Sequence, residues 1–292
     1  MEIIIAKNSG LCYGVKRALN IARETRQKKT GNVYTLGDLI HNPQVIADLK
    51  QQGIQSVTDL DEFDQGWVII RSHGVSPDIY RRLQKKNIKI VDATCPIVKK
   101  IQRLVEMLAK EKKEIIIVGN REHPEIQGLI GYSQGKGIIV ENEDRVRQLP
   151  RKKKRAVLAQ STQDLYLFEK IVAALIEKTE ELKVFNTICH STQTRQKATS
   201  ELASCVDTLF IVGGKNSSNT NKLFQISKRI LPNTHFIESA NQINHEMLKG
   251  SKKIGLSGGA STPPEAIQEA VDKIKTSFKH PFQREKIIQC QR

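Results

Sequence analysis

Short apolar runs alternate along this chain with longer segments in which apolar residues recur every three or four positions. Short runs rich in β-branched residues predict buried strands, and the longer period predicts amphipathic helices. The clearest helical stripe runs from Ile97 to Leu108. The predicted strands are residues 3–6, 33–36, 68–71, 88–91, 115–118, 138–140, 156–159, 184–185, 209–212, 235–237 and 254–256.

This alternation predicts an α/β fold with mainly parallel sheets, whose strands are usually apolar because helices cover both faces. Two basic segments depart from the pattern. We expect residues 151–155 to form an exposed loop before a strand. We expect the segment from Lys279 onward, which has no clear period, to be a frayed basic tail.

Three of the five cysteines stand at nearly even intervals, each where a predicted strand gives way to a helix. They are Cys12, Cys95 and Cys189. The even spacing predicts three similar lobes. We expect these to be residues 13–95, residues 96–188, and residues 189–278 together with 1–12, followed by the basic tail 279–292.

Each of these cysteines is well placed to bind a metal. Pro96 favours the first helical position, so the Cys95 sulfur should lie at a helix N-terminus, which stabilises a thiolate. Taken alone, any one of the three is more readily an ordinary buried cysteine. Three in equivalent settings favour a joint site, and three thiolates leave one position of a metal centre open for catalysis. Cys205, expected inside a helix, and Cys290, in the tail, lack this setting.

The composition narrows the class of protein. Five widely spaced cysteines do not form a secretory disulfide pattern, the first residues do not resemble a signal peptide, and no apolar run is long enough to span a bilayer. We therefore expect a cytoplasmic protein with no membrane partner. The formal net charge of +16 fits acidic partners, but for charge alone we favour a solvated basic surface. An aromatic content of 5% and the lack of RNA-binding or zinc-finger motifs argue against nucleic acid.

Three histidines lie in polar turns that follow predicted strands: His41 in LIHNPQV, His73 in RSHGVS and His123 in NREHPEIQG. Parallel α/β folds bind ligands at the carboxyl ends of their strands. No HxxxH or HxH spacing proposes zinc, so the turns suit a phosphate better than a metal. Each histidine singly could equally be a hydrogen-bonded structural residue.

Two glycine-rich loops extend this anion-binding character. Ser217, Ser218 and Asn219 lie in GGKNSSNTNKL, and Ser261 lies in GGASTPPE. Hydroxyl and amide side chains beside free backbone N–H groups can cradle an anion. A plain serine N-cap explains either loop equally well, and neither loop matches the phosphate loop of nucleoside triphosphatases. Glu125, two residues after His123, would become a proton donor if burial raised its pKa.

Together these segments resemble the 4-hydroxy-3-methylbut-2-enyl diphosphate reductase family, the iron–sulfur enzymes that end the non-mevalonate isoprenoid pathway. The resemblance covers residues 10–262, nearly the whole chain. Single motifs are weak, but eight in the family's order are specific. They are GLCYGVKRA, LIHNPQV, SHGV, DATCPIVKK, HPEIQG, TIC, KNSSNTNKL and GGAST.

The resemblance implies a fold, a reaction and a set of roles. The fold would be a pseudo-threefold trefoil of three α/β lobes around one 4Fe–4S cluster. Cys12, Cys95 and Cys189 would hold that cluster, whose fourth iron would be open to the substrate's hydroxyl. Two electrons and two protons would convert the substrate into isopentenyl and dimethylallyl diphosphate, with Glu125 as proton donor. The implied diphosphate ligands are His41, His73, His123, Ser217, Ser218, Asn219 and Ser261.

Some features depart from the family pattern. Ser161 and Ser191 stand where we expect threonine and alanine, so either Ser161 or Thr162 could supply the hydroxyl near the substrate. The basic tail and the high positive charge are not family features. They suggest docking of an acidic electron donor, a ferredoxin or flavodoxin.

Three alternatives remain at this stage. Quinolinate synthase and the diphthamide radical enzyme also use three cysteines in three lobes, but they would lack HPE and KNSSN in this arrangement. A basic nucleic-acid-binding protein would explain the charge, and its binding would survive replacement of the cysteines.

Overall fold

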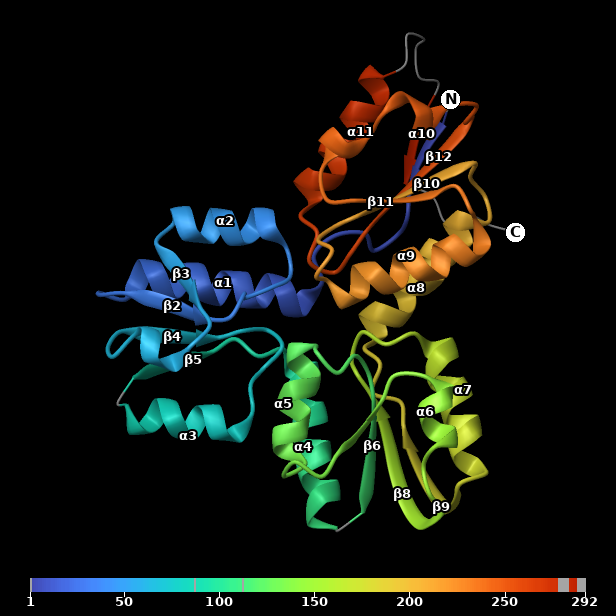
Figure 1. Ribbon diagram of the computed structural model, residues 1–292. Coiled ribbons are helices and arrows are strands. Elements are labelled where there is room, and N and C mark those ends of the chain that lie inside the picture. The colour runs from blue at the N-terminus through green and yellow to red at the C-terminus, as the bar shows by residue number, and fades with distance from the viewer. Residues whose placement is uncertain (1, 87, 112, 278–283, 288–292) are drawn as a thin grey trace. The chain divides into compact units, whose positions relative to one another are not determined.

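The computed structural model describes residues 2–86, 88–111, 113–277 and 284–287. Among these residues it contains three separate sheets, each with its own helices (Figure 1). We call each sheet with its helices a lobe. The chain also divides into two compact units. The first unit is Met1–Tyr13, His41–Val45 and His190–Arg292, and the second is Gly14–Ile40 and Ile46–Cys189.

The first lobe has the strand order β3-β2-β4-β5, with parallel pairing throughout. Its strands are short, and Val68 and Ile70 are fully buried. The elements are α1 (Tyr13–Lys28), β2 (Val33–Leu36), α2 (Pro43–Gln51), β3 (Ile54–Val57), the 3-10 helix η1 (Leu60–Glu62), β4 (Trp67–Ile70), α3 (Pro77–Lys85) and β5 (Lys89–Asp92).

The second lobe has the order β7-β6-β8-β9, again entirely parallel. Its elements are α4 (Pro96–Lys110), β6 (Glu114–Val118), α5 (Pro124–Tyr132), β7 (Ile138–Val140), α6 (Glu143–Arg147), β8 (Lys152–Ala159), α7 (Leu165–Ile176) and β9 (Thr179–Phe185).

The third lobe has the order β11-β10-β12-β1-β13 and is parallel throughout. Its elements are β1 (Glu2–Ile5), α8 (His190–Ala203), β10 (Thr208–Val212), α9 (Ser218–Ile230), β11 (Thr234–Ile237), η2 (Ala240–Gln242), α10 (His245–Leu248), β12 (Lys253–Gly258), α11 (Pro264–Thr276) and β13 (Arg284–Ile287).

All three lobes share one strand order. With the first strand taken as β2, β6 or β10, each sheet reads second-first-third-fourth, and the fourth strand is β5, β9 or β1. The third lobe takes its fourth strand from the start of the chain. The expected three-lobed, mainly parallel α/β class is confirmed, and the expected trefoil around a cluster and the lobe boundaries stay predictions.

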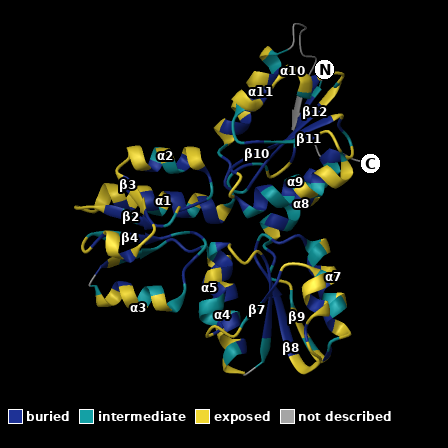
Figure 2. Ribbon diagram, viewed as in Figure 1, coloured by how far each residue is buried: buried dark blue, intermediate teal, exposed yellow. Residues whose placement is uncertain are grey.

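Alternating side chains give the sheets buried faces on both sides. In β6, Ile116 and Val118 belong to one apolar cluster, and Ile115 and Ile117 belong to another. The central strands β4, β6, β10 and β12 are largely buried, edge strands such as β9 are partly exposed, and Figure 2 shows the outer faces of the helices as exposed. Buried strands therefore leave only their ends, where the loops begin, available for chemistry. None of the described helices has the length and apolar character needed to cross a bilayer.

Two expectations about basic segments were wrong. Residues 152–155 form the start of β8 and not a loop, with Lys152 opposite Thr179 of β9. Arg155 is fully buried because its guanidinium pairs with Glu114 and donates to the backbone oxygen of Lys178 at 2.7 Å. Part of the expected tail, Arg284–Ile287, is strand β13 beside β1. Residues 279–283 and 288–292, with Cys290, lie outside the described residues.

Two smaller differences concern local structure. Strand β3 was not predicted from the sequence, because only its end residues, Ile54 and Val57, are apolar and buried. Cys205 lies in the turn after α8 and not inside a helix.

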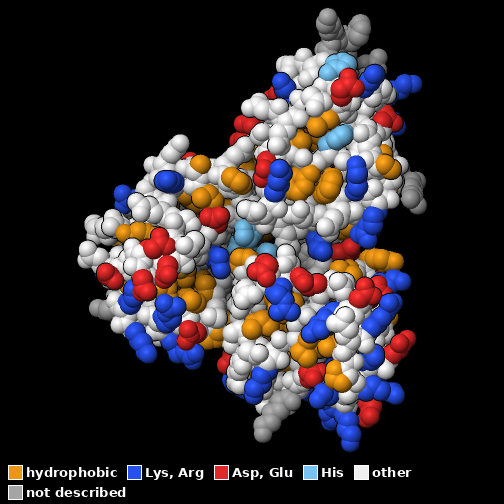
Figure 3. All heavy atoms as spheres, viewed as in Figure 1, with side chains coloured by type: hydrophobic (Ala, Val, Ile, Leu, Met, Phe, Trp, Pro, Cys, Tyr) orange, Lys and Arg blue, Asp and Glu red, His pale blue; other side chains and the backbone are white. Residues whose placement is uncertain are grey.

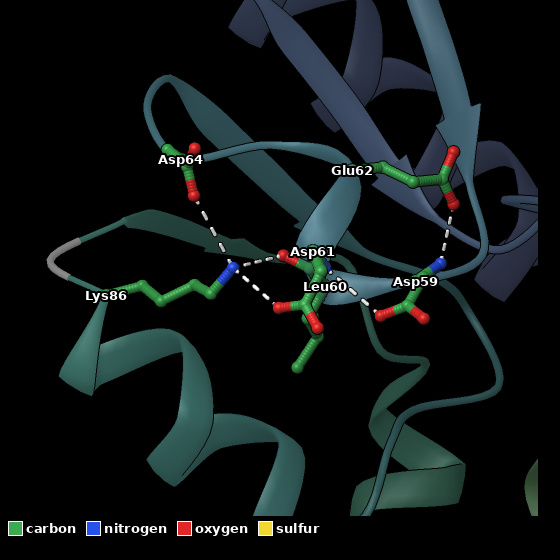
Figure 4. Close-up of polar contacts among 6 residues, drawn as sticks. All are labelled: Asp59, Leu60, Asp61, Glu62, Asp64 and Lys86. Atoms are coloured by element: carbon green, nitrogen blue, oxygen red, sulfur yellow. Dashed lines mark hydrogen bonds and ion pairs between the residues drawn. The ribbon is translucent and has the colours of Figure 1, made fainter.

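Lys86, at the end of α3, binds the acidic loop of residues 59–64 in the first lobe (Figure 4). Its ammonium group lies 2.9 Å from Asp61 and 3.5 Å from Asp64, and it donates to the Leu60 backbone oxygen at 2.7 Å. The hydrogen bond with Asp61 raises the pKa of Lys86 and lowers that of Asp61. The other two acids of the loop form a capping box around η1. These carboxylates have structural partners, so the loop is not a candidate site.

Candidate functional site

The predicted site residues follow the same strands in every lobe. Each first strand leads to a polar loop with His41, His123 or Ser217, and each third strand leads to a loop with His73, Ser161 or Ser261. In this strand order the first and third strands are neighbours whose connections leave in opposite directions. Parallel sheets bind ligands at that point. The fourth strand of each lobe leads to a cysteine.

The three cysteines occupy equivalent positions. Cys12, Cys95 and Cys189 are half-buried cysteines outside any disulfide, and each directly precedes a helix. Each backbone N–H donates to a carbonyl in the loop after its lobe's third strand. Cys95 donates to Ser72 at 2.9 Å, Cys189 to Ser161 at 2.9 Å, and Cys12 to Ala260 at 3.0 Å.

This threefold equivalence fits three ligands of one metal centre. The thiols are unoxidised, and a thiolate at a helix start is favoured by the helix dipole. Soft thiolate sulfur is the donor that iron–sulfur clusters take. The donor set therefore suits such a cluster chemically. Cys12 belongs to the first compact unit, and Cys95 and Cys189 belong to the second.

Glu125 lies in the first turn of α5 and is only 2% exposed. Its Oε1 accepts the backbone N–H of Ser161 at 2.7 Å, and its Oε2 accepts the Ser161 hydroxyl at 2.6 Å. Burial raises the pKa of Glu125, and the two bonds from Ser161 oppose that rise. The result is a buried carboxyl group that holds its proton to higher pH than an exposed glutamate.

His123 is the N-cap of α5, and its Nδ1 accepts the Glu125 backbone N–H at 3.2 Å. A neutral imidazole with Nδ1 as acceptor carries its proton on Nε2, which can then donate to a ligand. The ring of His73 meets that of His123 edge to face, with centroids 5.3 Å apart. These two histidines, which come from different lobes, are therefore neighbours within the second compact unit.

Thr162 points to a different partner from Ser161. Its Oγ1 accepts a bond from Gln160 Nε2 at 3.0 Å, and Gln160 Oε1 accepts the Asn120 backbone N–H at 3.1 Å. Gln160 is 1% exposed and was missed from sequence, although a polar residue at the end of an apolar strand was a usable signal. The hydroxyl that contacts the buried acid belongs to Ser161.

The first compact unit holds the other predicted anion ligands. Ser217 is the N-cap of α9, where its Oγ accepts the Thr220 N–H at 3.3 Å. Ser261 donates its hydroxyl to the His41 backbone oxygen at 3.0 Å and lies 3.4 Å from Ser217 Oγ. Ser218 is half-buried at the first residue of α9. The serine N-cap interpretation is therefore correct for Ser217, and it leaves the hydroxyl hydrogen free to be donated.

Asn219 carries the clearest sign of an anion site. It is 3% exposed, and both polar atoms of its side chain lack a hydrogen-bond partner within the described part of the chain. An unbonded buried amide costs about 1–3 kcal/mol. That cost is removed when the amide donates to a ligand oxygen.

The loop of Ser261 packs tightly on the start of α9. A Cβ added at Gly259 would lie 2.0 Å from Thr220 Oγ1 and 3.1 Å from Thr220 Cβ. Only glycine permits this approach, so Gly259 brings Ser261 next to Ser217.

Three like-ordered lobes, each with one cysteine anchored to the loop after its third strand, define a class of three-lobed α/β proteins with an equivalent cysteine in each lobe. The family model described as LytB protein matches residues 3–275. The chain belongs to the LytB family. This match excludes the quinolinate synthase and diphthamide alternatives.

Named relatives agree with the family match. A protein of Caldanaerobacter subterraneus subsp. tengcongensis named 4-hydroxy-3-methylbut-2-enyl diphosphate reductase is 44% identical over 280 residues, covering 94% of this chain and 97% of the relative. A protein of the same name from Aquifex aeolicus is 42% identical over 279 residues, covering 94% and 96%.

Two solved structures are also similar. One is titled (E)-4-hydroxy-3-methyl-but-2-enyl diphosphate reductase, the terminal enzyme of the non-mevalonate pathway. It is 42% identical with a TM-score of 0.69, covering 94% of this chain and 99% of its own. The other, the E-1-hydroxy-2-methyl-but-2-enyl-4-diphosphate reductase of Plasmodium falciparum, is 31% identical with a TM-score of 0.90, covering 94% and 88%.

Proposed function

We propose that this chain removes the hydroxyl group of 4-hydroxy-3-methylbut-2-enyl diphosphate by reduction. The reaction consumes two electrons and two protons, releases water, and gives isopentenyl and dimethylallyl diphosphate. Family membership and the names of the relatives support the substrate. The observation that carries the proposal is the set of three equivalent cysteines, each anchored by the same N–H···O contact in three like-ordered lobes.

Cys12, Cys95 and Cys189 would hold a 4Fe–4S cluster as thiolates, one ligand from each lobe. When bound, that cluster supplies the electrons and an iron with an open position that polarises the substrate's hydroxyl. A reducing, cytoplasmic setting, which keeps the thiols free, is part of the same proposal.

Glu125 donates the proton that turns the departing hydroxyl into water. Its burial keeps the carboxyl protonated at a pH where an exposed glutamate is ionised. Ser161 holds both carboxyl oxygens through its N–H and its hydroxyl, which orients the acid. Activity should therefore be lost as pH rises through the pKa of Glu125.

The diphosphate is bound by side chains that donate hydrogen bonds. His123 offers Nε2–H, and Ser217 and Asn219 offer a hydroxyl and an unbonded amide at the start of α9. The dipole of α9, whose positive end lies at this turn, adds to the positive potential. His41, His73, Ser218 and Ser261 complete the proposed set.

An anaerobic assay of cluster-reconstituted protein with the hydroxylated diphosphate and a reduced donor tests the proposal. We expect both isomeric diphosphates as products. Glu125→Gln should lower turnover by about 10²- to 10⁴-fold, because a positioned general acid contributes that much. Its iron content should match that of the parent protein.

Glu122→Gln is the matched control, because Glu122 is an exposed carboxylate three residues earlier in the chain. It should leave turnover within about twofold, as an exposed group with no role would. A protein that stays colourless and iron-free after anaerobic reconstitution would contradict the cluster. Full turnover by Glu125→Gln would contradict the role of the acid.

A further inference from the structure

The helices that follow the three cysteines share a charge pattern at their start, which α2, α7 and α9 also have. None of α1, α4 and α8 has an acidic residue in its first turn. Their first acids are Glu24, Glu106 and Glu201, near the far end of each helix. Acids are normally favourable at a helix N-terminus because they oppose the helix dipole. Leaving them out keeps the potential at the cysteine end of each helix positive.

The start of α4 presents this charge to solvent beside Cys95. Ile97, two residues after the cysteine, is 38% exposed, and Lys100 and Arg103 are exposed on the following turns. Lys99 does not belong to this set of surface cations, because its ammonium group pairs with Asp92 at 2.7 Å. The first two turns of α4 thus combine an exposed aliphatic side chain with two unpaired surface cations, as far as the described ion pairs show.

The start of α1 adds to the same surface. Arg17 donates from Nη1 to the backbone oxygen of Thr94, the residue before Cys95, at 3.1 Å. This contact places the first turns of α1 against the Cys95 loop within the second compact unit. Lys16, next to Arg17, is exposed. We call the surface of Lys16, Arg17, Ile97, Lys100 and Arg103 the α4 face.

We propose that an acidic protein carrying one electron at a time docks on the α4 face. The inference rests on the proposed function, in which electrons must reach a cluster held partly by Cys95. Two reduced donor molecules would each lose one electron per substrate, and with two protons the hydroxyl would leave as water. Complementary charge steers such an encounter, and an exposed apolar side chain gives it a contact that excludes water.

Other basic surfaces fit this role less well. On the face drawn in Figure 3, Lys and Arg side chains are interspersed with Asp and Glu. The basic run of Lys152 and Lys153 begins β8, whose opposite end leads to the loop that anchors Cys189. An eight-residue strand is about 25 Å long, so an electron arriving at its start is far from the Cys189 thiol. The α4 face, in contrast, includes Ile97, two residues after Cys95, and Arg17, which bonds the residue before it.

Charge reversal at the α4 face tests the proposal. Lys100→Glu with Arg103→Glu is compared with Lys152→Glu with Lys153→Glu, which changes the net charge equally at the far end of β8. Turnover of the holoenzyme is measured with a reduced acidic flavodoxin and with a photoreduced, uncharged deazaflavin. Binding of oxidised flavodoxin is measured separately by calorimetry.

We expect the α4 variant to lose about 10- to 100-fold in kcat/KM with flavodoxin at low ionic strength, because steering of this size is typical of charged partners. Flavodoxin binding should weaken in parallel, while deazaflavin-supported turnover stays within about twofold of the parent. The control should keep both activities. Ile97→Ser should weaken flavodoxin binding without changing its dependence on salt.

Two results would overturn the docking proposal. One is unchanged binding and turnover with flavodoxin in the α4 variant. The other is an equal loss in the control, which would show that only net charge matters. If the parent enzyme fails to reduce the substrate even with deazaflavin, the proposed function itself is wrong. If the double variant loses its cluster, Lys100→Glu alone decides the question by the same two measurements.

Discussion

Ser161 makes contacts in two directions. Its N–H and hydroxyl both bond Glu125, and its carbonyl accepts the N–H of Cys189 at 2.9 Å. Sequence left open whether Ser161 or Thr162 supplies a hydroxyl near the substrate. Ser161 donates its hydroxyl to Glu125 and Thr162 accepts a bond from Gln160, so the choice between the two stays a prediction. A serine suffices where a threonine was expected, since only the hydroxyl and the backbone are used.

Removing that hydroxyl should change the pH dependence of the reaction. Ser161→Ala deletes a bond that lowers the pKa of Glu125, so the pKa should rise further. Activity needs the protonated acid, and the alkaline limb of the kcat profile should therefore move to higher pH. Ser161→Thr should keep the profile of the parent. Thr162→Ala is the control and should not move that limb.

The same substitution should affect stability in a pH-dependent way. A carboxyl group with a raised pKa in the folded state destabilises the fold as pH rises through that pKa. Without the Ser161 hydroxyl, the ionised form lacks a partner for one oxygen, which costs about 1–3 kcal/mol. Urea unfolding should show the loss for Ser161→Ala above the pKa of Glu125 and little loss below it. Equal losses at both pH values would contradict this account.

At the scale of elements, helices begin where site residues lie. Pro96 after Cys95, His123 before α5 and Ser217 before α9 were all legible in the sequence, because capping residues and prolines mark helix starts. The strand ends were legible from the apolar runs. What could not be read was which polar atoms remain unbonded, as in Asn219, since that depends on contacts between distant segments.

The meeting of the Ser261 loop with α9 gives a test at this scale. Gly259→Ala would place a Cβ 2.0 Å from Thr220 Oγ1, and overpacking of this kind costs about 1–3 kcal/mol. Thr220→Ala removes the clashing atom, so the double variant should recover part of that loss. Urea unfolding of the two single variants and the double variant measures the recovery.

Gly128→Ala in α5 is the matched control. Its added Cβ would meet the Val75 backbone at 3.6 Å, an ordinary contact, and alanine is the better helix former by up to about 1 kcal/mol. This variant should be as stable as the parent or more stable. An additive double variant, with no recovery from Thr220→Ala, would show that the close approach does not constrain the loop.

At the scale of the molecule, each lobe closes its own apolar core. The sheets should therefore stay folded without a bound cluster. We expect Cys12→Ser, Cys95→Ser and Cys189→Ser each to lower iron content several-fold while the far-UV circular dichroism stays unchanged. Each variant serves as a control for the other two, because equivalent ligands should show an equal loss of iron when replaced. A variant that keeps its full iron content would remove that cysteine from the proposed ligand set.

Even spacing of the cysteines was enough to predict three lobes, but it did not reveal their shared strand order. That order depends on which strands pair, and pairing is a long-range property that short apolar runs do not encode. The same limit applies to Arg155, whose burial follows from partners on other segments of the second lobe. It also applies to β13, whose four residues gain strand structure only by lying beside β1.

The third lobe takes its fourth strand from the opposite end of the chain, since Ile3 pairs with Ile254. Strand β1 leaves the ribosome first, yet its partner β12 is made only after two complete lobes. Contacts so distant in sequence form slowly, and domains made earlier fold first. The first two lobes can therefore fold during synthesis, while β1 stays unpaired until β12 has been made. Cys12 is thus the first of the three thiols to be synthesised and the last to reach its place.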